Sequence, residues 1–347
     1  MRIESVRALK AELTSGLEDN AVAESFAVLR DMAANVVGAV GSPRRMVSKG
    51  PALPNGVVLG VSPGEGDKGG RKLAVRFQEQ SEEAARFGHY IVGKARGEVD
   101  IQFVGQVFAG RPAKGGSGEY QNSQRPLRNG YSIGHYLVTA GTLGCFVKNK
   151  SGTVGVLSNN HVLGNINLAK KGDEVLQQGA ADGGALPKDV VGSFVKLVKL
   201  LPKGNKADAA WASIDPKFLD AKLFREYAGR SRGSLVKADD IVNSEKVWKV
   251  GRTTGLTKGT VTAIELDSVA VNYPDFGTAL FNGQVEITGA AGPFSLPGDS
   301  GSLILDDQNR ALGLLFGGSQ TGGPNGSGRT FASPLATALD LLGLRLA

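Results

Sequence analysis

The chain has 347 residues, of which 41% are hydrophobic and 21% charged, and its formal net charge is +7. This length suggests about two domains, and the composition is ordinary for a soluble globular protein. Lysine and arginine are scattered, without a dense basic run interleaved with aromatic residues, so nucleic acid is not an expected partner. The first residues are charged throughout and contain no apolar run that fits a signal peptide or a membrane span, so we expect a cytoplasmic protein with no membrane partner.

Residues 1–38 are predicted to form two amphipathic helices. In the first, apolar residues recur at helical spacing between charged ones: Ile3, Val6, Leu9, Leu13 and Leu17. Asn20 can cap the second, whose apolar residues are Val22, Phe26, Leu29 and Met32. Little neighbouring chain is available to cover these stripes, so we expect them to dock on the body of the protein or on a partner. A loop with three prolines follows, over residues 38–56.

Residues 57–109 are predicted to be a small α/β unit. Residues 73–77 are a predicted strand, and residues 99–104 alternate between apolar and polar as a second strand does. Between them, Ser81 is suited to cap a helix that carries two glutamates in its first turn. Residues 110–130 are rich in Gly, Ser, Gln and Asn, and we expect a linker that is open to cleavage.

From residue 131 onward, short apolar runs alternate with Gly-rich turns, which is typical of β-barrels. We expect one barrel over residues 131–215, a charged and partly helical bridge over residues 216–243, and a second barrel over residues 246–331. A closing helix over residues 334–346 begins with a proline, which suits the first helical turn. The predicted fold class is therefore mainly β: a double β-barrel preceded by N-terminal helices and the α/β unit.

The most informative stretch is residues 296–304, which place Ser300 in a glycine-rich turn. Gly298 and Gly301 permit a tight turn that lifts the serine hydroxyl out of a strand mouth. Serine is a weak nucleophile by itself, so this interpretation needs a histidine and an acid elsewhere in the chain. The alternative is an ordinary β-turn, which a chain with 50 glycines can produce by chance.

Only three histidines are available as the base. His161 follows an apolar strand and a Ser-Asn-Asn sequence, which places it at a strand end with one face free. His89 lies in the predicted helix, where we expect it to pack, and His135 lies on or beside a strand and is a weaker candidate. The best acid is Asp208, which enters a buried strand and there needs a partner such as an imidazole N–H. The order along the chain is His161, Asp208, Ser300.

Together these segments resemble the chymotrypsin-like serine proteases, over about two thirds of the chain. The sequences NNHVL, DAAWA and GDSGS around His161, Asp208 and Ser300 match the histidine, aspartate and serine motifs of that family in the same order. Residues 250–261 resemble the opening of the second barrel in bacterial members, and residues 315–319 resemble the strand that pairs with substrate. The chain looks most like uncharacterised bacterial trypsin-like proteins with an N-terminal extension, a group related to plant narrow-leaf-type proteases.

The resemblance implies a serine endopeptidase that needs no cofactor or metal and cleaves protein or peptide substrates through an acyl-enzyme. Ser300 would be the nucleophile, His161 the base and then the acid, and Asp208 the residue that orients the imidazole. The N–H groups of Gly298 and Ser300 would form the oxyanion hole. Two alternatives stay open: a catalytically silent protease fold kept for binding, and a protease that is self-inhibited or recruited to a partner through residues 1–128.

The resemblance also indicates where substrate would lie. Gly317 and Gly318 would leave room for the substrate backbone to pair as an added strand. Phe294 and Ser295 fall at the base of the primary pocket. No acid stands there, so a preference for Arg or Lys is not supported, and Phe294 either shortens the pocket or points away.

Two features depart from the family. Many members have a serine beside the triad aspartate where this chain has Leu315, so one hydrogen bond to the aspartate is in question, and Ser158 is the candidate replacement. Secreted trypsin-like enzymes usually carry several disulfides, whereas Cys145 is the only cysteine here and lies in an apolar run. We expect it to be a buried core thiol rather than a nucleophile.

Arg252 is predicted to form an ion pair with Asp299. In trypsin-like zymogens, a freed N-terminal amine pairs with the aspartate before the serine and shapes the oxyanion hole. Some bacterial relatives use instead the arginine of a Gly-Arg-Thr-Thr-Gly segment, which this chain has at residues 251–255. A guanidinium remains charged when buried and can hold a carboxylate with two hydrogen bonds. The alternative is a surface arginine and an aspartate bonded only to backbone.

Overall fold

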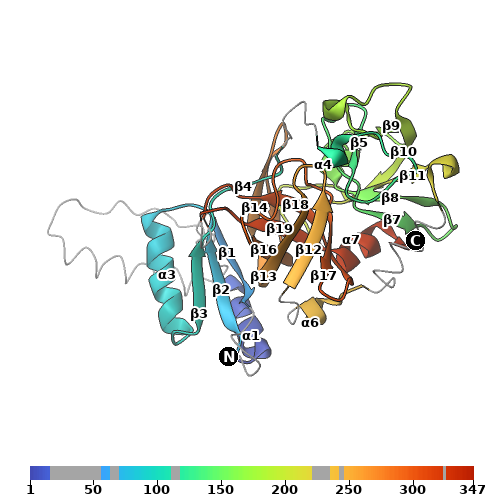
Figure 1. Ribbon diagram of the computed structural model, residues 1–347. Coiled ribbons are helices and arrows are strands. Elements are labelled where there is room, and N and C mark those ends of the chain that lie inside the picture. The colour runs from blue at the N-terminus through green and yellow to red at the C-terminus, as the bar shows by residue number, and fades with distance from the viewer. Residues whose placement is uncertain (16–55, 63–69, 111–117, 221–234, 242–245, 323–325) are drawn as a thin grey trace.

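The computed structural model describes residues 1–15, 56–62, 70–110, 118–220, 235–241, 246–322 and 326–347. Figure 1 shows the α/β unit, the second barrel and the first barrel in a row, with the second barrel in the middle. The predicted second N-terminal helix lies outside the described residues, as do residues 111–117 of the predicted linker and most of the predicted bridge.

The first barrel is a half-barrel of short strands. Its elements are β5 (Ser132–His135), β6 (Gly141–Thr142), β7 (Cys145–Lys148), β8 (Val154–Ser158), β9 (Glu174–Leu176), β10 (Val190–Leu197) and β11 (Ala210–Ile214), with the turns η1 (Glu119–Gln121), α4 (Asn160–Leu163), η2 (Ala180–Asp182) and η3 (Pro216–Phe218). The strands pair in the order β7-β8-β11-β10-β9-β5-β6, and the C-terminal β20 (Arg345–Leu346) adds to β7. Ser158 stands opposite Ala210, so the end of β8 lies beside the start of β11.

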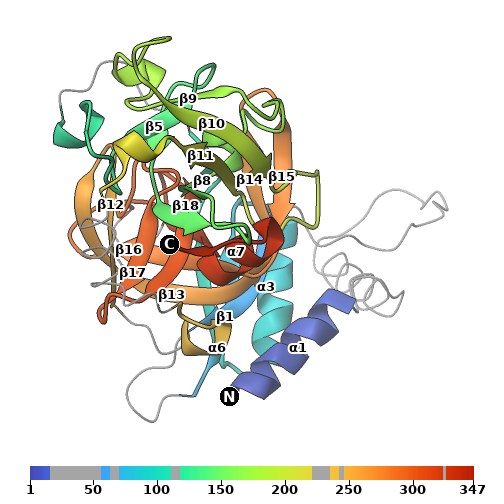
Figure 2. The ribbon, with the colours of Figure 1, turned by 90° about the vertical axis from the view of Figure 1, so that its right-hand side faces the viewer.

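The second barrel is closed. Its strands are β12 (Lys246–Gly251), β13 (Gly255–Asp267), β16 (Gln284–Gly289), β17 (Leu303–Asp306), β18 (Ala311–Gly318) and β19 (Thr330–Pro334). They form a ring in the order β12-β13-β16-β19-β18-β17, which leaves few unpaired strand edges. A hairpin of β14 (Val269–Tyr273) and β15 (Gly277–Phe281) extends from this barrel (Figure 2), and Phe281 forms a β-bridge with Asn205 in the segment before β11. The short helix α6 (Ala238–Ile241) adds Ile241 to the core.

The α/β unit continues the sheet of the second barrel. Its elements are α1 (Ile3–Ser15), β1 (Val57–Ser62), β2 (Lys72–Phe77), α3 (Glu82–Lys94), β3 (Val99–Phe103) and β4 (Val107–Phe108). β1 pairs with β2 and, on its other edge, with β13, while α3 connects the parallel strands β2 and β3. The predicted strands and helix cap are confirmed: the Ser81 hydroxyl accepts a hydrogen bond from the Ala84 N–H.

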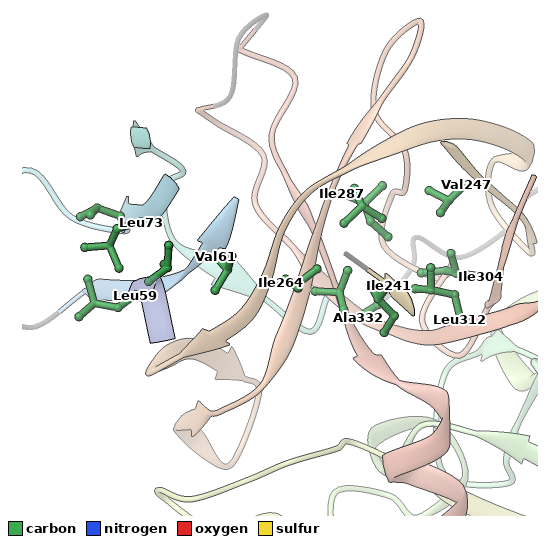
Figure 3. Packing of buried hydrophobic residues seen from close by; sticks show 14 of the residues in the cluster. Leu59, Val61, Leu73, Ile241, Val247, Ile264, Ile287, Ile304, Leu312 and Ala332 are labelled. Atoms are coloured by element: carbon green, nitrogen blue, oxygen red, sulfur yellow. The ribbon is translucent and has the colours of Figure 1, made fainter. Parts of the chain in front are cut away.

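One hydrophobic core joins the α/β unit to the second barrel. Figure 3 shows buried side chains running from Leu59 past Ile264 to Ile304. Val6 and Leu13 of α1 are buried in the same core, so the first predicted apolar stripe packs on the body of the protein. Each fully buried aliphatic side chain contributes about 1.5–3 kcal/mol, so this junction stabilises both parts.

A buried cluster of charges crosses the same junction. Nε of Arg76 on β2 donates to both carboxylate oxygens of Glu286 on β16, at 3.0 and 2.9 Å. A terminal nitrogen of Arg76 donates to Asp100 at 2.7 Å. The Arg76 and Glu286 side chains are fully buried, and leaving either one unpaired would cost about 3–5 kcal/mol. The pairing therefore fixes how the unit sits on the barrel.

The prediction of a mainly β protein with a double barrel is confirmed. The closing helix is shorter than predicted: α7 (Leu335–Leu342) ends where Gly343 adopts a left-handed φ of 71°, and Leu346 lies in β20 instead. Cys145 is a buried thiol, as predicted, and burial raises its pKa to about 12. His89 lies in α3 as predicted, but its side chain is exposed rather than packed.

Candidate active site

His161 and Asp208 meet at the ends of β8 and β11. After β8, the turn α4 directs His161 so that its Nδ1 lies 2.6 Å from Oδ2 of Asp208. Oδ1 of the same carboxylate accepts hydrogen bonds from the backbone N–H groups of Asn160 and His161, at 2.6 and 3.3 Å. Asp208 is completely buried, and a buried carboxylate needs such donors. Because the carboxylate only accepts, Nδ1 carries the proton and Nε2 is left as an acceptor.

Tyr273 is a further partner of Asp208 that was not predicted from the sequence. Its hydroxyl donates to Oδ2 of Asp208 at 2.9 Å, and its ring meets the His161 imidazole edge-on, with 5.8 Å between centroids. Burial and the neighbouring carboxylate raise the pKa of Tyr273 well above its usual value of 10, so the phenol stays protonated as a donor. The predicted replacement is wrong: Ser158 donates instead to the carbonyl oxygen of Thr142, at 2.7 Å.

The turn that carries Ser300 packs against the same strand ends. Gly298 and Gly301 have φ values of +101° and +92°, as the predicted turn requires. The Ser300 carbonyl oxygen accepts a hydrogen bond from the Thr142 N–H at 2.8 Å. A Cβ on Gly301 would lie 2.0 Å from the Ser158 hydroxyl oxygen, so only glycine allows this approach to the end of β8.

His161 and Ser300 flank one glycine. A Cβ on Gly141 would lie 2.4 Å from a methyl group of Val162, the residue after His161, and 3.1 Å from the Ser300 carbonyl oxygen. Nε2 of His161 is buried and has no hydrogen-bond partner among the described residues. Hydrogen bonds between a base and its nucleophile are often long in unliganded enzymes. His161 therefore keeps an acceptor nitrogen, and α4, which carries it, approaches the serine turn across Gly141.

Two backbone N–H groups of the serine turn likewise have no acceptor among the described residues. The Pro297 carbonyl oxygen accepts from the Thr253 hydroxyl at 2.8 Å, and a trans peptide places the N–H of Gly298 on the opposite side. The Gly298 carbonyl oxygen accepts from the Thr142 hydroxyl at 2.9 Å. Within the described part of the chain, neither the Gly298 N–H nor the Ser300 N–H donates to an acceptor. An oxyanion hole needs two donors of this kind.

Asp299 is held by the turn between β12 and β13. Its Oδ1 accepts from the N–H groups of Thr253 and Thr254, at 2.8 and 3.1 Å. Its Oδ2 accepts from the Thr254 hydroxyl at 2.7 Å and from the Leu296 N–H at 3.0 Å. Lys249 on β12 supplies the opposite charge, since its Nζ lies 3.5 Å from Oδ2 and both side chains are 0% exposed. Burial lowers the pKa of Lys249, and the attraction of Asp299 opposes that shift.

The predicted ion pair between Arg252 and Asp299 is wrong, and so is the alternative of a surface arginine. Arg252 is buried, and its guanidinium pairs with both oxygens of Asp182, with Nε at 2.8 Å from one of them. The Ser132 hydroxyl donates to the same carboxylate at 2.5 Å. Backbone N–H groups already satisfy Oδ1 of Asp299, so the guanidinium extends to η2 of the first barrel and ties the two barrels together.

The predicted substrate-binding residues do not share one surface. Phe294 is buried in the core, so it points away from a primary pocket. The hydroxyls of Ser295 and Thr330 lie 2.7 Å apart, and a Cβ on Gly318 would lie 3.6 Å from the Ser295 oxygen, so these three residues are neighbours. Gly317 and Gly318 end β18, where β4 pairs with the strand edge that was expected to receive substrate.

A pocket of about 530 Å³ lies beside β4, with Gln78, Gln106, Phe108 and Gln320 in its lining. Over the described ranges, no three or more His, Cys, Asp or Glu side chains are grouped so that they could hold a metal ion. None of the helices that the structure describes is both long and apolar enough to cross a membrane.

Residues 234–328 match a family model described as the Nal1 C-terminal domain. No curated protein matches the chain. Among solved structures, the chain is similar to the chymotrypsin of Cellulomonas bogoriensis, with 24% identity, 63% of this chain and 97% of that chain covered, and a TM-score of 0.42. Protease A of Thermobifida fusca and the Nocardiopsis protease are 20% and 22% identical, each over 63% of this chain and 97% of theirs, with TM-scores of 0.40. The roles of individual residues follow from the contacts within this chain.

Proposed function

We propose that this protein is a serine endopeptidase of the chymotrypsin-like family, which hydrolyses peptide bonds through an acyl-enzyme. The observation that carries the proposal is the His161–Asp208 hydrogen bond, together with the buried Nε2 of His161 and two N–H groups of the serine turn, none of which has a hydrogen-bond partner among the described residues. A fold kept only for binding would need neither the buried acid nor the free donors. These features therefore favour an enzyme over a silent binding module.

In the proposed reaction, Ser300 Oγ attacks the substrate carbonyl carbon while Nε2 of His161 takes its proton. The carbonyl oxygen becomes an oxyanion and accepts hydrogen bonds from Gly298 and Ser300, each typically worth about 2.7–4 kcal/mol. The imidazolium, stabilised by Asp208, then gives its proton to the leaving amine. Water attacks the acyl-enzyme with His161 again as base, which releases the acid product and restores the serine.

The serine turn is proposed to form without cleavage of the chain. In trypsin-like zymogens a freed amine must reach the aspartate before the serine. Here the buried ammonium of Lys249 already lies beside Asp299, and Thr253 and Thr254 donate to the same carboxylate. Charge-assisted hydrogen bonds of this kind are about twice as strong as neutral ones, so they can hold the turn in place.

We also propose that the protein acts in the cytoplasm on protein or peptide substrates, and that residues 1–128 regulate or recruit it. Cys145 is a free, buried thiol, which fits a reducing compartment. The α/β unit within residues 1–128 contacts the edge of the candidate site through β4, which gives that region a route to influence activity.

A fluorophosphonate probe tests the proposed chemistry, because it reacts with an activated serine. We expect labelling of the wild-type protein at Ser300, and a loss of about 10⁶-fold in peptidase turnover in Ser300→Ala and in His161→Ala. His89→Ala is the matched control, because that side chain is exposed on α3, and it should react as the wild type does. Folded wild-type protein that is never labelled would contradict the proposal and favour the binding module.

A further inference from the structure

β4 lies on the edge of β18 where a substrate would pair. Phe108 stands opposite Gly318 in antiparallel register, and a Cβ on Gly317 would lie 3.2 Å from the Phe108 carbonyl oxygen. On its other side β4 pairs in parallel with β14, with Val107 opposite Val271. Figure 1 shows β4 beside β14, between the α/β unit and the first barrel. Addition of an extended chain to a sheet edge is a common mode of peptide recognition.

The chain that follows β4 runs toward the serine turn. The Ala109 N–H donates to the Asn272 carbonyl oxygen at 3.1 Å. Gly110 then lies against Pro297, because a Cβ placed on it would be 3.1 Å from Pro297 Cγ. Pro297 immediately precedes Gly298, whose N–H is half of the proposed oxyanion hole. The segment thus connects the β18 edge with the turn at which a scissile carbonyl must lie.

Side chains alternate along this segment as they do in an extended strand. Val107 and Ala109 are 0% and 2% exposed, while Phe108 between them is 45% exposed. The two residues at the end of this segment are small: Ala109 has only a methyl group and Gly110 has no side chain. Any side chain at position 110 would press on Pro297, because its Cβ would lie 3.1 Å from Pro297 Cγ, closer than an ordinary van der Waals contact.

We infer that residues 107–110 occupy the protein's own substrate groove in the place of an extended peptide. This inference rests on the proposed endopeptidase function and adds a substrate class to it. The groove takes an extended chain with a buried apolar residue, a variable residue, and two small residues next to the bond that is cut. An external substrate must displace this segment, so the segment acts as an internal competitor.

Val107 is the anchor that holds the segment. Its side chain is buried in a cluster with Phe316 of β18 and Phe331 of β19. β4 itself is only two residues long, so few backbone hydrogen bonds replace this anchor when it is lost. Phe108, by contrast, is 45% exposed and lines the pocket beside β4, so a change there removes less core packing than a change at Val107.

Val107→Asp and its matched control Phe108→Asp test the inference, because they add the same charge at adjacent positions that face the core and the solvent. The readout is kcat/KM on a fluorogenic peptide with Val-Phe-Ala-Gly before the reporter amide. We expect a rise of about tenfold or more in Val107→Asp, about threefold in the milder Val107→Ala, and less than about twofold in Phe108→Asp. Unchanged or lower values in both Val107 variants, with Ser300 still reactive, would overturn the inference.

Labelling by the small fluorophosphonate separates this inference from the proposed function. The probe needs the serine turn but not the long groove, so wild type and variants should be labelled at rates within about threefold of one another. If none is labelled, the proposed function fails, and binding of the capped peptide Gly-Gln-Val-Phe-Ala-Gly decides the inference. In a Ser300→Ala background, tighter binding to the Val107→Asp protein than to the Phe108→Asp protein supports it, and equal affinity contradicts it. Val107→Ala replaces Val107→Asp in this measurement if the thermal melt shows that the latter does not fold.

Discussion

The serine turn and the β18 edge beside it are stabilised in contrasting ways. The turn depends on contacts inside the second barrel, where Lys249 and Thr254 hold Asp299. The edge is completed from outside the barrel, by β4 of the α/β unit. In the proposed enzyme, the chemistry is therefore built into the barrels, whereas access to it is set by residues that precede them.

The contrast extends to how firmly each part is attached. The α/β unit is fixed to the second barrel by a shared core and by the buried Arg76–Glu286 pair. By contrast, β4 contributes only a two-residue strand to the edge of β18. Release of the groove therefore requires movement of a short strand only, while the rest of the unit stays in place.

The largest expected effect falls on the chemistry alone. Asp208→Asn should lower kcat by about 10⁴-fold, because an amide cannot hold the imidazole in the required tautomer, while KM for a peptide changes little. Steady-state kinetics on a peptide substrate measure both values. Asp173→Asn is the control, since Asp173 pairs with His135 at 3.0 Å rather than with His161. A similar loss of kcat in both variants would show that the effect is not specific to the triad.

The Arg252–Asp182 ion pair between the two barrels is expected to stabilise the fold. Arg252→Ala leaves the carboxylate of Asp182 buried without its partner, which is expected to lower the free energy of unfolding by about 3–5 kcal/mol. Urea denaturation measures this loss. The double variant Arg252→Leu/Asp182→Leu removes both charges and should recover most of it. A loss below about 1 kcal/mol in Arg252→Ala would show that the pair does not hold the barrels together.

Lys249 tests how the serine turn is held. Lys249→Met should lower the free energy of unfolding by about 1–3 kcal/mol. This loss is smaller than that expected for Arg252→Ala, because Asp299 keeps its backbone and hydroxyl donors. Since burial lowers the folded-state pKa of Lys249, the unfolded chain binds its proton more tightly. The stability of wild type relative to Lys249→Met should therefore rise with pH, between that lowered pKa and the ordinary value of 10.5. A stability difference that stays constant over this range would contradict the burial of a charged lysine.

Among these variants, substitution of Tyr273 should have the smallest effect. Tyr273→Phe keeps the aromatic contact with His161 but removes one of the hydrogen bonds to Asp208, so we expect kcat to fall by about tenfold or less with KM unchanged. Tyr273→Leu removes the ring as well, so its kcat should be lower still. Equal kinetics in wild type and Tyr273→Phe would mean that the remaining donors orient Asp208 by themselves.

Features that depend on a few neighbouring residues could be predicted from the sequence. His161, Asp208 and Ser300 each stand in a short pattern, a strand end or a glycine turn, that restricts where the side chain goes. The predicted strands at 73–77 and 99–104, found as β2 and β3, and the Ser81 cap follow from apolar runs and local hydrogen bonding in the same way. The burial of Cys145 follows from the apolar residues on either side.

Only the tertiary structure decided which distant groups meet. Alternation along β14 places Tyr273 on the face of the buried Val269 and Val271, but it does not identify Asp208, 65 residues away, as the acceptor. Arg252 pairs with Asp182, 70 residues away, while backbone N–H groups close to Arg252 in the sequence satisfy Asp299. Local patterns determine the direction of a side chain, whereas its partner depends on how separate segments pack. The position of β4 on the β18 edge is a result of that packing.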